Sequence, residues 1–394
     1  MRALHDFIQQ HEQDWHNDLR KLISIDCGTT NKAGVDAVGA IITAKCIEWG
    51  WDMQTYPQEK WGDCHTATLH GTGTGRIMLM GHLDTVYFDG TVATHPARKE
   101  GNKLYAPGAG DMKSGLLVGM YAMRALQQTK FAGFESLTFF FNSDEEHGSP
   151  VSQTITKALA PTMDAALVFE PARASGAIVS ARKASAKFAI HIQGLSAHAG
   201  IAPEKGINAV VAAAHYALAA AALNKCVPGV TVTPTVLHGG GAANVVPDEA
   251  TVQIDCRAED ATGVQAVEEG MREVALRDFV AGAVVTMTGG FSSAPMAKTT
   301  SVALMADLAR EAAADLDFVL QDVATGGASD ANTIAPYCPV IDGLGPVSGN
   351  AHNAELEYIE TDSIVPRTTM AALLIQKILQ PDNLARLRAT APQA

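Results

Sequence analysis

Three short apolar stretches of the sequence each lead directly into side chains that can bind a metal ion. They read RIMLMGHLD (76–84), SLTFFFNSDEE (136–146) and DAALVFE (164–170). Runs of this length and composition are typical of strands that are buried in a sheet. In an open α/β sheet, ligands bind beyond the carboxyl ends of the strands. Three strands that deliver His, Asp and Glu to one edge therefore indicate a metal site of the kind that hydrolases use.

Five candidate side chains come from these stretches: His82, Asp84, Glu145, Glu146 and Glu170. His82 and Asp84 are two residues apart at a strand end, so their side chains point to the same face. A neutral His can bind a metal through one ring nitrogen while a carboxylate orients the ring through the other. Of the adjacent acids Glu145 and Glu146, one can face a metal and the other the substrate water, where a carboxylate suits a general base. Taken singly, each position is also compatible with a solvated turn at a strand end.

Asp111 and His352 are further candidates, and both lie in loops. Asp111 is part of the glycine-rich stretch PGAGDMKSG, where it could bridge two metals or cap the helix that follows. His352 is part of the polar stretch GPVSGNAHNAELEYIE before the last helix, where a single His is usually a surface residue. Two imidazoles and three carboxylates together form a mixed N/O set that suits two zinc ions with one bridging carboxylate. That set consists of His82, Asp111, Glu146, Glu170 and His352.

Helices and strands alternate over residues 1–175, which predicts a largely parallel sheet flanked by helices. The expected helices cover 5–24, 33–49, a segment from the end of GAGDMKSG to 128, and 152–159. The expected strands cover 52–56, 64–70 and 76–83, followed by the strands that run into Glu145 and Glu170. These elements would bring the candidate residues to one edge of the sheet.

The pattern changes near Gly176, where strands and helices follow in the order βαββαβ. The expected strands cover 187–194, 230–238, 249–257 and 283–288, and the expected helices cover 205–224 and 263–276. A unit of about a hundred residues is the size of a small inserted domain. From Thr300 the α/β alternation resumes and ends in a helix over 361–379. We therefore predict an α/β fold with a catalytic domain in two parts, 1–180 and 293–394, and an inserted α+β domain at 181–292.

Charge and composition exclude several classes of function. The 394 residues carry 29 basic and 42 acidic side chains, a net charge of −13, which argues against nonspecific binding to nucleic acid or to an anionic membrane. No run reaches the ~20 apolar residues of a membrane span, and the first residues, MRALHDFIQQHEQDW, lack the apolar segment of a secretory signal. The six cysteines show no CxxC spacing, so we expect a reduced, cytoplasmic protein.

The motifs, in their order along the chain, resemble a known family. They are HLD, GAGDMKSG, DEEHGS, FEP, LSAHAG, an N-x12-R spacing and NAHNAE. This set is similar to the M20 family of di-zinc metallopeptidases and deacylases, and within it to the glutamate carboxypeptidase (carboxypeptidase G2) group, over nearly the whole chain. The resemblance implies two zinc ions per chain, one held by His82 and Glu170 and the other by Glu146 and His352, with Asp111 as the bridge.

The resemblance also implies roles for residues around the metals. Asp84 would orient His82, Glu145 would be the general base, and the Asp111–Met112 peptide would be cis. The inserted domain would be a lid and dimerisation domain, and the protein a homodimer. Residues of that domain and of the TGGASDAN loop would bind substrate. His198 would help stabilise the oxyanion, in many members in the partner subunit's site, Asn244 and Arg257 would hold the substrate's terminal carboxylate, and Gly326 and Gly327 would line the pocket.

Read from the residues alone, these last positions have plainer interpretations: a surface turn for His198, a loop for Asn244 and a strand end for Arg257. The sequence also departs from the glutamate-selective relatives, which carry basic residues on either side of the lid. The matching stretches here read SGAIVS and GGFSSAP, and Ala324 stands where that group has Arg. We therefore do not predict selectivity for glutamate; a pocket with Phe291 and small residues suits an apolar or aromatic C-terminal residue.

The sequence leads to two enzyme hypotheses and to alternatives of other classes. The first is a di-zinc carboxypeptidase that cleaves the amide bond beside a free C-terminal carboxylate in a small molecule or short peptide. The second is an N-acyl-amino-acid deacylase, like the aminoacylases and acetylornithine deacetylases, with the same site. A metal-free scaffold protein would lack the ligands, and a nucleotide-dependent enzyme would need a phosphate loop that the sequence does not contain. N/O ligand sets also accept Co²⁺ or Mn²⁺ in place of zinc.

Overall fold

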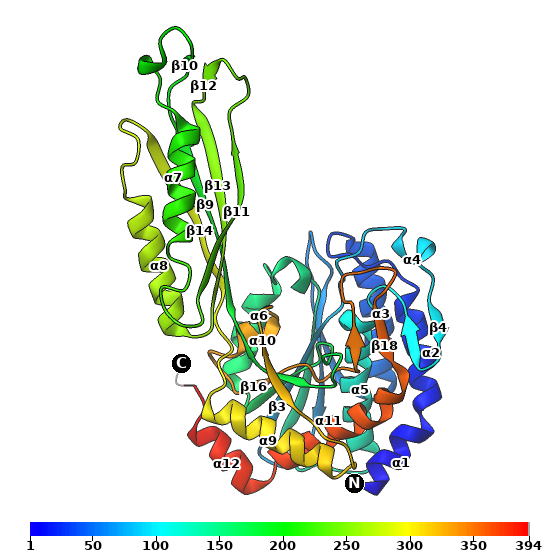
Figure 1. The fold of residues 1–394 in the computed structure, drawn as a ribbon. Helices are drawn as coiled ribbons and strands as arrows, with labels where there is room; N and C mark the ends of the chain where they lie inside the picture. The colour runs from blue at the N-terminus through cyan, green and yellow to red at the C-terminus, as the bar shows by residue number, and fades with distance from the viewer. Residues whose placement is uncertain (393–394) are drawn as a thin grey trace. The chain divides into compact units, whose positions relative to one another are not determined.

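The computed structural model describes residues 1–392, which divide into two compact units (Figure 1). The first unit comprises Met1–Ser180, Lys298–Ala324 and the chain from Ser329 onward, and the second comprises Ala181–Ala297 and Thr325–Ala328. We predicted the segment Thr325–Ala328 within the catalytic domain. It belongs to the second unit because Arg182 and Lys183 of that unit donate hydrogen bonds to its carbonyl groups, at 3.0 Å to Gly327 and 3.2 Å to Thr325.

A six-stranded sheet forms the centre of the first unit. Its strands, in spatial order, are β1 (Asp52–Tyr56), β2 (Cys64–His70), β6 (Ser136–Asn142), β3 (Arg76–His82), β7 (Ala165–Val168) and β16 (Val340–Ile341). The pairs β6–β3, β3–β7 and β7–β16 are parallel, and the pairs β1–β2 and β2–β6 are antiparallel. The mainly parallel sheet that the apolar runs predicted is therefore confirmed, and those runs are its central strands.

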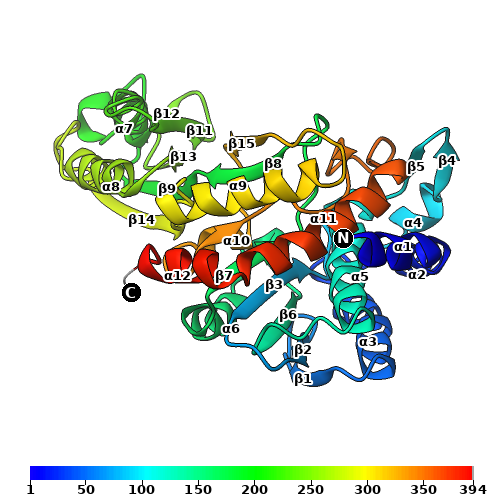
Figure 2. The ribbon, with the colours of Figure 1, turned by 90° about the horizontal axis from the view of Figure 1, so that it is seen from below.

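Helices pack around this sheet. They are α1 (Arg2–Gln10), α2 (Glu12–Ile23), α3 (Lys32–Glu48), α4 (Thr91–Thr94), α5 (Ser114–Gln128), α6 (Ser152–Leu159), α9 (Thr300–Ala314), α10 (Asp330–Ile334), α11 (Ile364–Ile378) and α12 (Pro381–Ala389). Figure 2 shows α5 and α11 side by side, where they contact each other. Short 3-10 turns lie at Glu145–His147, Ala160–Thr162, Pro203–Lys205 and Thr361–Ser363. The single helix predicted over 5–24 is two helices, because His11 leaves the helical backbone (φ −104°, ψ 12°).

Glycines let α5 lie directly against the sheet. A Cβ atom at Gly115 would lie 1.9 Å from the Phe169 carbonyl oxygen, and one at Gly119 would lie 2.5 Å from the Phe139 ring. Only residues without a side chain allow so close an approach. The start of α5, and the loop before it that carries Asp111, are therefore held next to the ends of the central strands.

A second, antiparallel sheet in the first unit has the order β17 (Ser348–Gly349), β18 (Tyr358–Glu360), β5 (Lys103–Tyr105) and β4 (Arg98–Glu100). The sequence did not predict it, because strands of two or three residues are too short to show a period. A further two-stranded sheet consists of β8 (Ile178–Arg182) and β15 (Asp322–Thr325), within which the chain passes between the units. No helix among residues 1–392 is long and apolar enough to cross a bilayer.

The second unit has the predicted βαββαβ order. Its elements are β9 (Ala184–Gln193), α7 (Ala209–Ala221), β11 (Thr231–Gly239), β13 (Glu249–Ala258), α8 (Ala261–Ala275) and β14 (Val284–Ser293), and the strands form an antiparallel sheet in the order β11-β13-β9-β14. A core that includes Ile190, Val252, Tyr216 and Met271 lies between this sheet and the two helices. The short strands β10 (Ala197–His198) and β12 (Val245–Val246) pair with each other beyond the sheet (Figure 1).

Candidate metal centre

The ends of three neighbouring strands define the position of the site. In the parallel register, His82 at the end of β3 lies opposite Asn142 at the end of β6, and Met80 lies opposite Val168 at the end of β7. Glu170 follows β7 by two residues. The strands therefore deliver their polar residues to one edge of the sheet, as the apolar runs predicted.

Asp111 reaches the same edge from the segment Ala109–Lys113, whose backbone leaves helical angles at Asp111 (φ −114°, ψ 95°) and at Met112 (φ −132°, ψ 34°). Gly108 before it has a left-handed backbone (φ +70°), and the Asp111–Met112 peptide is cis, as the resemblance implied. Asp111 does not cap α5, since Lys113 occupies the cap position. Its two carboxylate oxygens face two different rings: Oδ1 lies 3.2 Å from Nε2 of His82, and Oδ2 lies 3.2 Å from Nε2 of His352.

Each of these two rings also has a glutamate beside it. Nε2 of His82 lies 3.6 Å from Oε1 of Glu170, and Nε2 of His352 lies 3.5 Å from Oε2 of Glu146. His352 has a left-handed backbone (φ +66°), a conformation that costs a non-glycine residue about 1–3 kcal/mol and is concentrated at functional sites. The five candidate ligands therefore form two groups, each with one imidazole, one glutamate and one oxygen of Asp111.

Asp84 is fully buried and connects the strand of His82 to the turn of the two acids. Its Oδ1 accepts a hydrogen bond from the backbone amide of Glu145 at 3.2 Å, and its Oδ2 accepts from that of Glu146 at 3.2 Å and from the Thr29 hydroxyl at 2.7 Å. Nδ1 of His82 lies 2.9 Å from the carbonyl oxygen of Asp84 and 3.4 Å from its carboxylate. The backbone and the side chain of Asp84 therefore both face the ring.

Glu145 lies beside His82 and Glu170 of the first group. Ligand atoms of His82, Glu145 and Glu170 are all within 4.8 Å of one another, as are those of His82, Asp111 and Glu146. Burial, with the negative charges of Glu170 and Asp330, raises the pKa of the Glu145 carboxyl well above its ordinary value, although His82 opposes this. A carboxylate of raised basicity beside two candidate ligands is suited to accept a proton.

The other pKa shifts have the same origin. Burial and the charge of Asp111 raise the pKa of Glu146 to about 8. Burial alone would lower the pKa of His82, but Asp111, Asp84 and Glu170 raise it well above its ordinary value. Burial would raise the pKa of Asp111, but its contacts with His352 and His82 hold it below the usual range. Carboxylates that oppose each other's ionisation, and that attract a proton to a buried imidazole, equally attract a divalent cation.

An unsatisfied carboxylate oxygen also indicates that these residues fit a metal ion. Oε1 of Glu146 is buried without a hydrogen-bond partner among residues 1–392. An unsatisfied buried carboxylate oxygen is costly, and a cation would satisfy it. Imidazole nitrogen with carboxylate oxygen is the donor set of zinc, and also of cobalt or manganese.

Two buried acids beside this centre were not predicted. Glu357 accepts hydrogen bonds from the backbone amides of Gly110 and Asp111. Asp330, at the start of α10, accepts from the hydroxyl of Ser149 at 2.6 Å and from the amide of Asn142 at 2.8 Å, and burial raises its pKa to about 6. The sequence LEYI (356–359) could have indicated that Glu357 is buried, because an acid between apolar and aromatic residues is usually buried and hydrogen-bonded.

The remaining predicted residues lie in the second unit. His198 in β10 is exposed, and its Nδ1 accepts a hydrogen bond from the amide of Gly200 at 3.1 Å. Asn244 is close to it, since its carbonyl oxygen accepts from the amide of Ala199 at 2.9 Å. Gly326 and Gly327 lie in the segment Thr325–Ala328. The structure thus brings His198 and Asn244 together.

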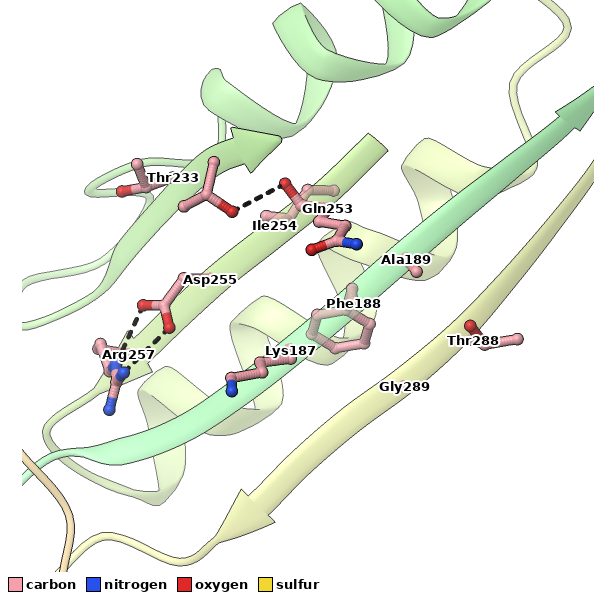
Figure 3. Close-up of a pocket in the computed structure, with 11 residues that line it drawn as sticks. Lys187, Phe188, Ala189, Thr233, Gln253, Ile254, Asp255, Arg257, Thr288 and Gly289 are labelled. Atoms are coloured by element: carbon pink, nitrogen blue, oxygen red, sulfur yellow. Dashed lines mark hydrogen bonds and ion pairs between the residues drawn. The ribbon is translucent and has the colours of Figure 1, made fainter. Parts of the chain in front are cut away.

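Arg257 lies elsewhere in this unit. It lines a cavity of about 650 Å³ on the sheet face opposite the helices, where its guanidinium pairs with both oxygens of Asp255 at 3.0 and 2.9 Å (Figure 3). Asn244 precedes Glu249, where β13 begins, whereas Arg257 is near its end. At ~3.3 Å per residue, Glu249 and Arg257 are about 26 Å apart. Within one unit, Asn244 and Arg257 therefore lie near opposite ends of β13, and their shared contact with a substrate carboxylate stays a prediction.

The chain is similar over most of its length to proteins of known sequence and structure. The sequence model described as "Peptidase family M20/M25/M40" matches residues 78–377. Carboxypeptidase G2 of Pseudomonas sp. (strain RS-16) is 30% identical over 368 residues, which cover 91% of this chain and 88% of that protein. Succinyl-diaminopimelate desuccinylase of Leptothrix cholodnii is 26% identical over 390 residues, covering 90% and 98%. The crystal structure of aminopeptidase PepT from Bacillus cereus is 21% identical with a TM-score of 0.74, covering 94% and 99%, which shows a shared fold.

Proposed function

This chain belongs to peptidase family M20/M25/M40 and is a metal-dependent hydrolase, and on that basis we propose that it is a di-zinc amidohydrolase that cleaves the amide bond beside a free C-terminal carboxylate. The observation that carries this proposal is the position of Asp111, whose two oxygens each face one imidazole at 3.2 Å. A carboxylate placed in this way suits a bridge between two metals.

We propose that His82 and Glu170 would hold one metal and that Glu146 and His352 would hold the other, with Asp111 as the carboxylate shared between them. When bound, two divalent cations would lower the pKa of a shared water and stabilise negative charge that develops on the substrate carbonyl oxygen. The imidazoles must be neutral to act as ligands, so binding a cation releases any proton held by His82. Asp84 contacts the Nδ1 side of His82, so Nε2, which faces Asp111 and Glu170, is the nitrogen that would bind a metal.

The chain's own acid–base group is Glu145. In this proposal its carboxylate takes a proton from the attacking water and passes it to the leaving amine nitrogen, so that water adds across the amide bond and a carboxylic acid and an amine result. Its raised pKa supports this role, because a base must hold the proton long enough to transfer it. Asp84 holds Glu145 in place by accepting a hydrogen bond from its backbone amide.

Recognition of the substrate is assigned to the second unit. We propose that Arg257 binds the free carboxylate, since a guanidinium can pair with both oxygens. In the structure Arg257 is paired with Asp255, so a substrate must compete with that contact. Selectivity for glutamate is not proposed, since the stretches SGAIVS and GGFSSAP carry no basic residue. An apolar or aromatic C-terminal side chain is proposed from the sequence around Phe291, which in the structure packs against the core of the second unit.

We also propose a homodimer in which His198 and Asn244 serve the site of the partner subunit. This proposal is supported by two positions. His198 and Asn244 lie near each other, and Asn244 lies before the start of β13, whereas Arg257 lies near its end. If all three act on one substrate, they must come from two chains.

The six cysteines are all unpaired, and five of them are buried, which supports our proposal of a reducing, cytoplasmic location.

A second candidate, an N-acyl-amino-acid deacylase, is favoured by the desuccinylase that matches over 98% of its own length. The two candidates differ in the acyl side of the amide bond. We would measure kcat/KM for N-acetyl and N-succinyl amino acids, for dipeptides and for N-benzoyl amino acids, each with Phe, Ala or Glu at the C-terminal position. The C-terminal carboxamides of the same compounds are the control. Hydrolysis that disappears with the carboxamides supports the proposal, and no hydrolysis of any free acid would contradict it.

A further inference from the structure

The loop that carries Asp111 rests on a buried carboxylate that is not a candidate ligand. Glu357 is 1% exposed, and its Oε1 accepts hydrogen bonds from the backbone amides of Gly110 at 2.8 Å and Asp111 at 3.0 Å. Its Oε2 accepts from the hydroxyl of Tyr87. All three donors belong to segments that follow β3 or precede α5. One side chain thus satisfies two backbone amides that would otherwise be buried without an acceptor.

The fit around this carboxylate is close. A Cβ atom at Gly110 would lie 3.2 Å from the Ser348 side chain and 3.4 Å from Oε1 of Glu357. A side chain at that position would push the loop away from Glu357. Because Gly110 has no side chain, the amides of Gly110 and Asp111 can approach Oε1 of Glu357. These contacts set the distance between the Asp111 loop and Glu357.

The backbone of Glu357 also contacts the loop that carries His352 and the segment that precedes Asp111. Its amide donates to the carbonyl of Asn353 at 2.8 Å, and its carbonyl accepts from the amide of Ala106 at 3.2 Å. Asn353 is the neighbour of His352. Glu357 therefore joins the loop of His352 through its backbone and the loop of Asp111 through its side chain.

We infer that Glu357, held by Tyr87, is the positioning residue that sets Asp111 between the two imidazoles, an inference that rests on the two-metal site proposed above. Glu357 contacts the backbone amides of Gly110 and Asp111 through its carboxylate. It acts through the backbone of Asp111, whose side chain must present one oxygen to His82 and the other to His352. Partners that orient metal ligands typically contribute about 10- to 100-fold in metal affinity.

The test uses Co²⁺, whose visible absorption reports coordination geometry, and metal-free full-length protein. The parent is titrated first; two Co²⁺ per chain are required by the proposed function, and none would refute that function whatever Glu357 does. Glu357→Leu keeps the size of the side chain and removes the acceptors. Its matched control is Glu355→Leu, an exposed acid in the same loop. The unfolding temperature of each metal-free variant is measured alongside.

We expect Glu357→Leu to bind at least one Co²⁺ about 10- to 100-fold more weakly, with an altered absorption spectrum at saturation, while Glu355→Leu matches the parent. Glu357→Gln keeps one acceptor for the two amides and should recover most of the affinity. Parent-like affinity and spectrum in Glu357→Leu, even with a lower unfolding temperature, would overturn the inference, as would a Gln variant as weak as the Leu variant. Should the Leu variant not fold, Tyr87→Phe decides: a weakened, altered Co²⁺ site supports the inference and a parent-like site overturns it.

Discussion

The buried carboxylate of Asp84 accepts a hydrogen bond from the backbone amide of Glu145 at 3.2 Å. Asp84 follows His82, the last residue of β3, by two positions, and Glu145 begins the short turn after the neighbouring strand β6. One side chain therefore fixes the distance between a candidate metal ligand and the candidate general base. This contact explains how a site assembled from separate strand ends can hold an acid at a defined place beside two imidazoles.

Replacing Asp84 with Asn tests this contact. The amide nitrogen of Asn cannot accept, so one of the amides of Glu145 and Glu146 loses its partner. We expect kcat to fall about 10- to 100-fold, with the protein still folded. Asp52→Asn is the control, since Asp52 is exposed and remote in the sheet. Steady-state kinetics with circular dichroism measure both, and an unchanged kcat in folded Asp84→Asn would contradict the assigned role.

The adjacent acids Glu145 and Glu146 should respond differently to the same change. Glu145→Gln removes the base and leaves the five candidate ligands intact, so we expect kcat to fall about 10²- to 10⁴-fold with metal content unchanged. Glu146→Gln removes a candidate ligand, so we expect metal content itself to fall. Metal analysis and kinetics on the same preparations separate the two. Equal metal loss in both variants would show that Glu145 is a ligand instead of the base.

The proposed exchange of residues between subunits has a direct consequence. Glu145→Gln and His198→Ala chains should each be nearly inactive alone. In a mixed dimer, one site combines an intact Glu145 with an intact His198 from the partner chain. Unfolding and refolding an equal mixture should then restore about a quarter of the parent activity, since about half of the dimers are mixed and each has one intact site. No recovery, or a monomer by light scattering, would refute the shared site.

An ion-pair cluster away from the site predicts a pH dependence of stability. Burial would raise the pKa of Asp322, but hydrogen bonds from Lys298 and Ser180 and the charge of Arg310 hold it below its ordinary value. A lowered folded-state pKa adds stability above the unfolded-state pKa, near 4, and that stability is lost as the pH falls through the folded-state value. Asp322→Asn should therefore destabilise the protein at pH 7 by roughly 1–2 kcal/mol, since both basic partners are partly exposed.

Denaturant unfolding of Asp322→Asn and the parent at pH 7 and pH 3 measures this effect. The difference between the two proteins should shrink at pH 3, which is below the unfolded-state pKa near 4, because the unfolded parent then takes up a proton at Asp322. Asp317→Asn changes an exposed acid five residues earlier that has no ion pair among the described residues, and its left-handed backbone (φ +61°) also suits Asn, so this change should not destabilise the protein. A difference that stays constant with pH would contradict the charge-based explanation.

Part of this site could be predicted because three of its candidate ligands, His82, Glu146 and Glu170, lie at or just after the ends of buried strands. The runs before His82, Glu146 and Glu170 set both the strands and the edge where they end, so the spacing of apolar and polar residues was sufficient. The contacts of Asp84 and Glu357 could not be predicted, since they join segments far apart in the sequence through backbone amides. Likewise, β4, β5, β17 and β18 are too short to show a pattern, and the break at His11 is a single-residue change of backbone angles.

Metal content tests the central claim most directly. The protein would be purified without added metal, and the metal ions per chain measured by mass spectrometry before chelation, after chelation and after zinc is returned. We predict about two zinc ions per chain, as the two ligand groups around Asp111 require, with activity lost and regained in step with them. A protein that takes up no stoichiometric metal even from excess zinc would contradict the five-ligand site and leave a non-enzymatic role.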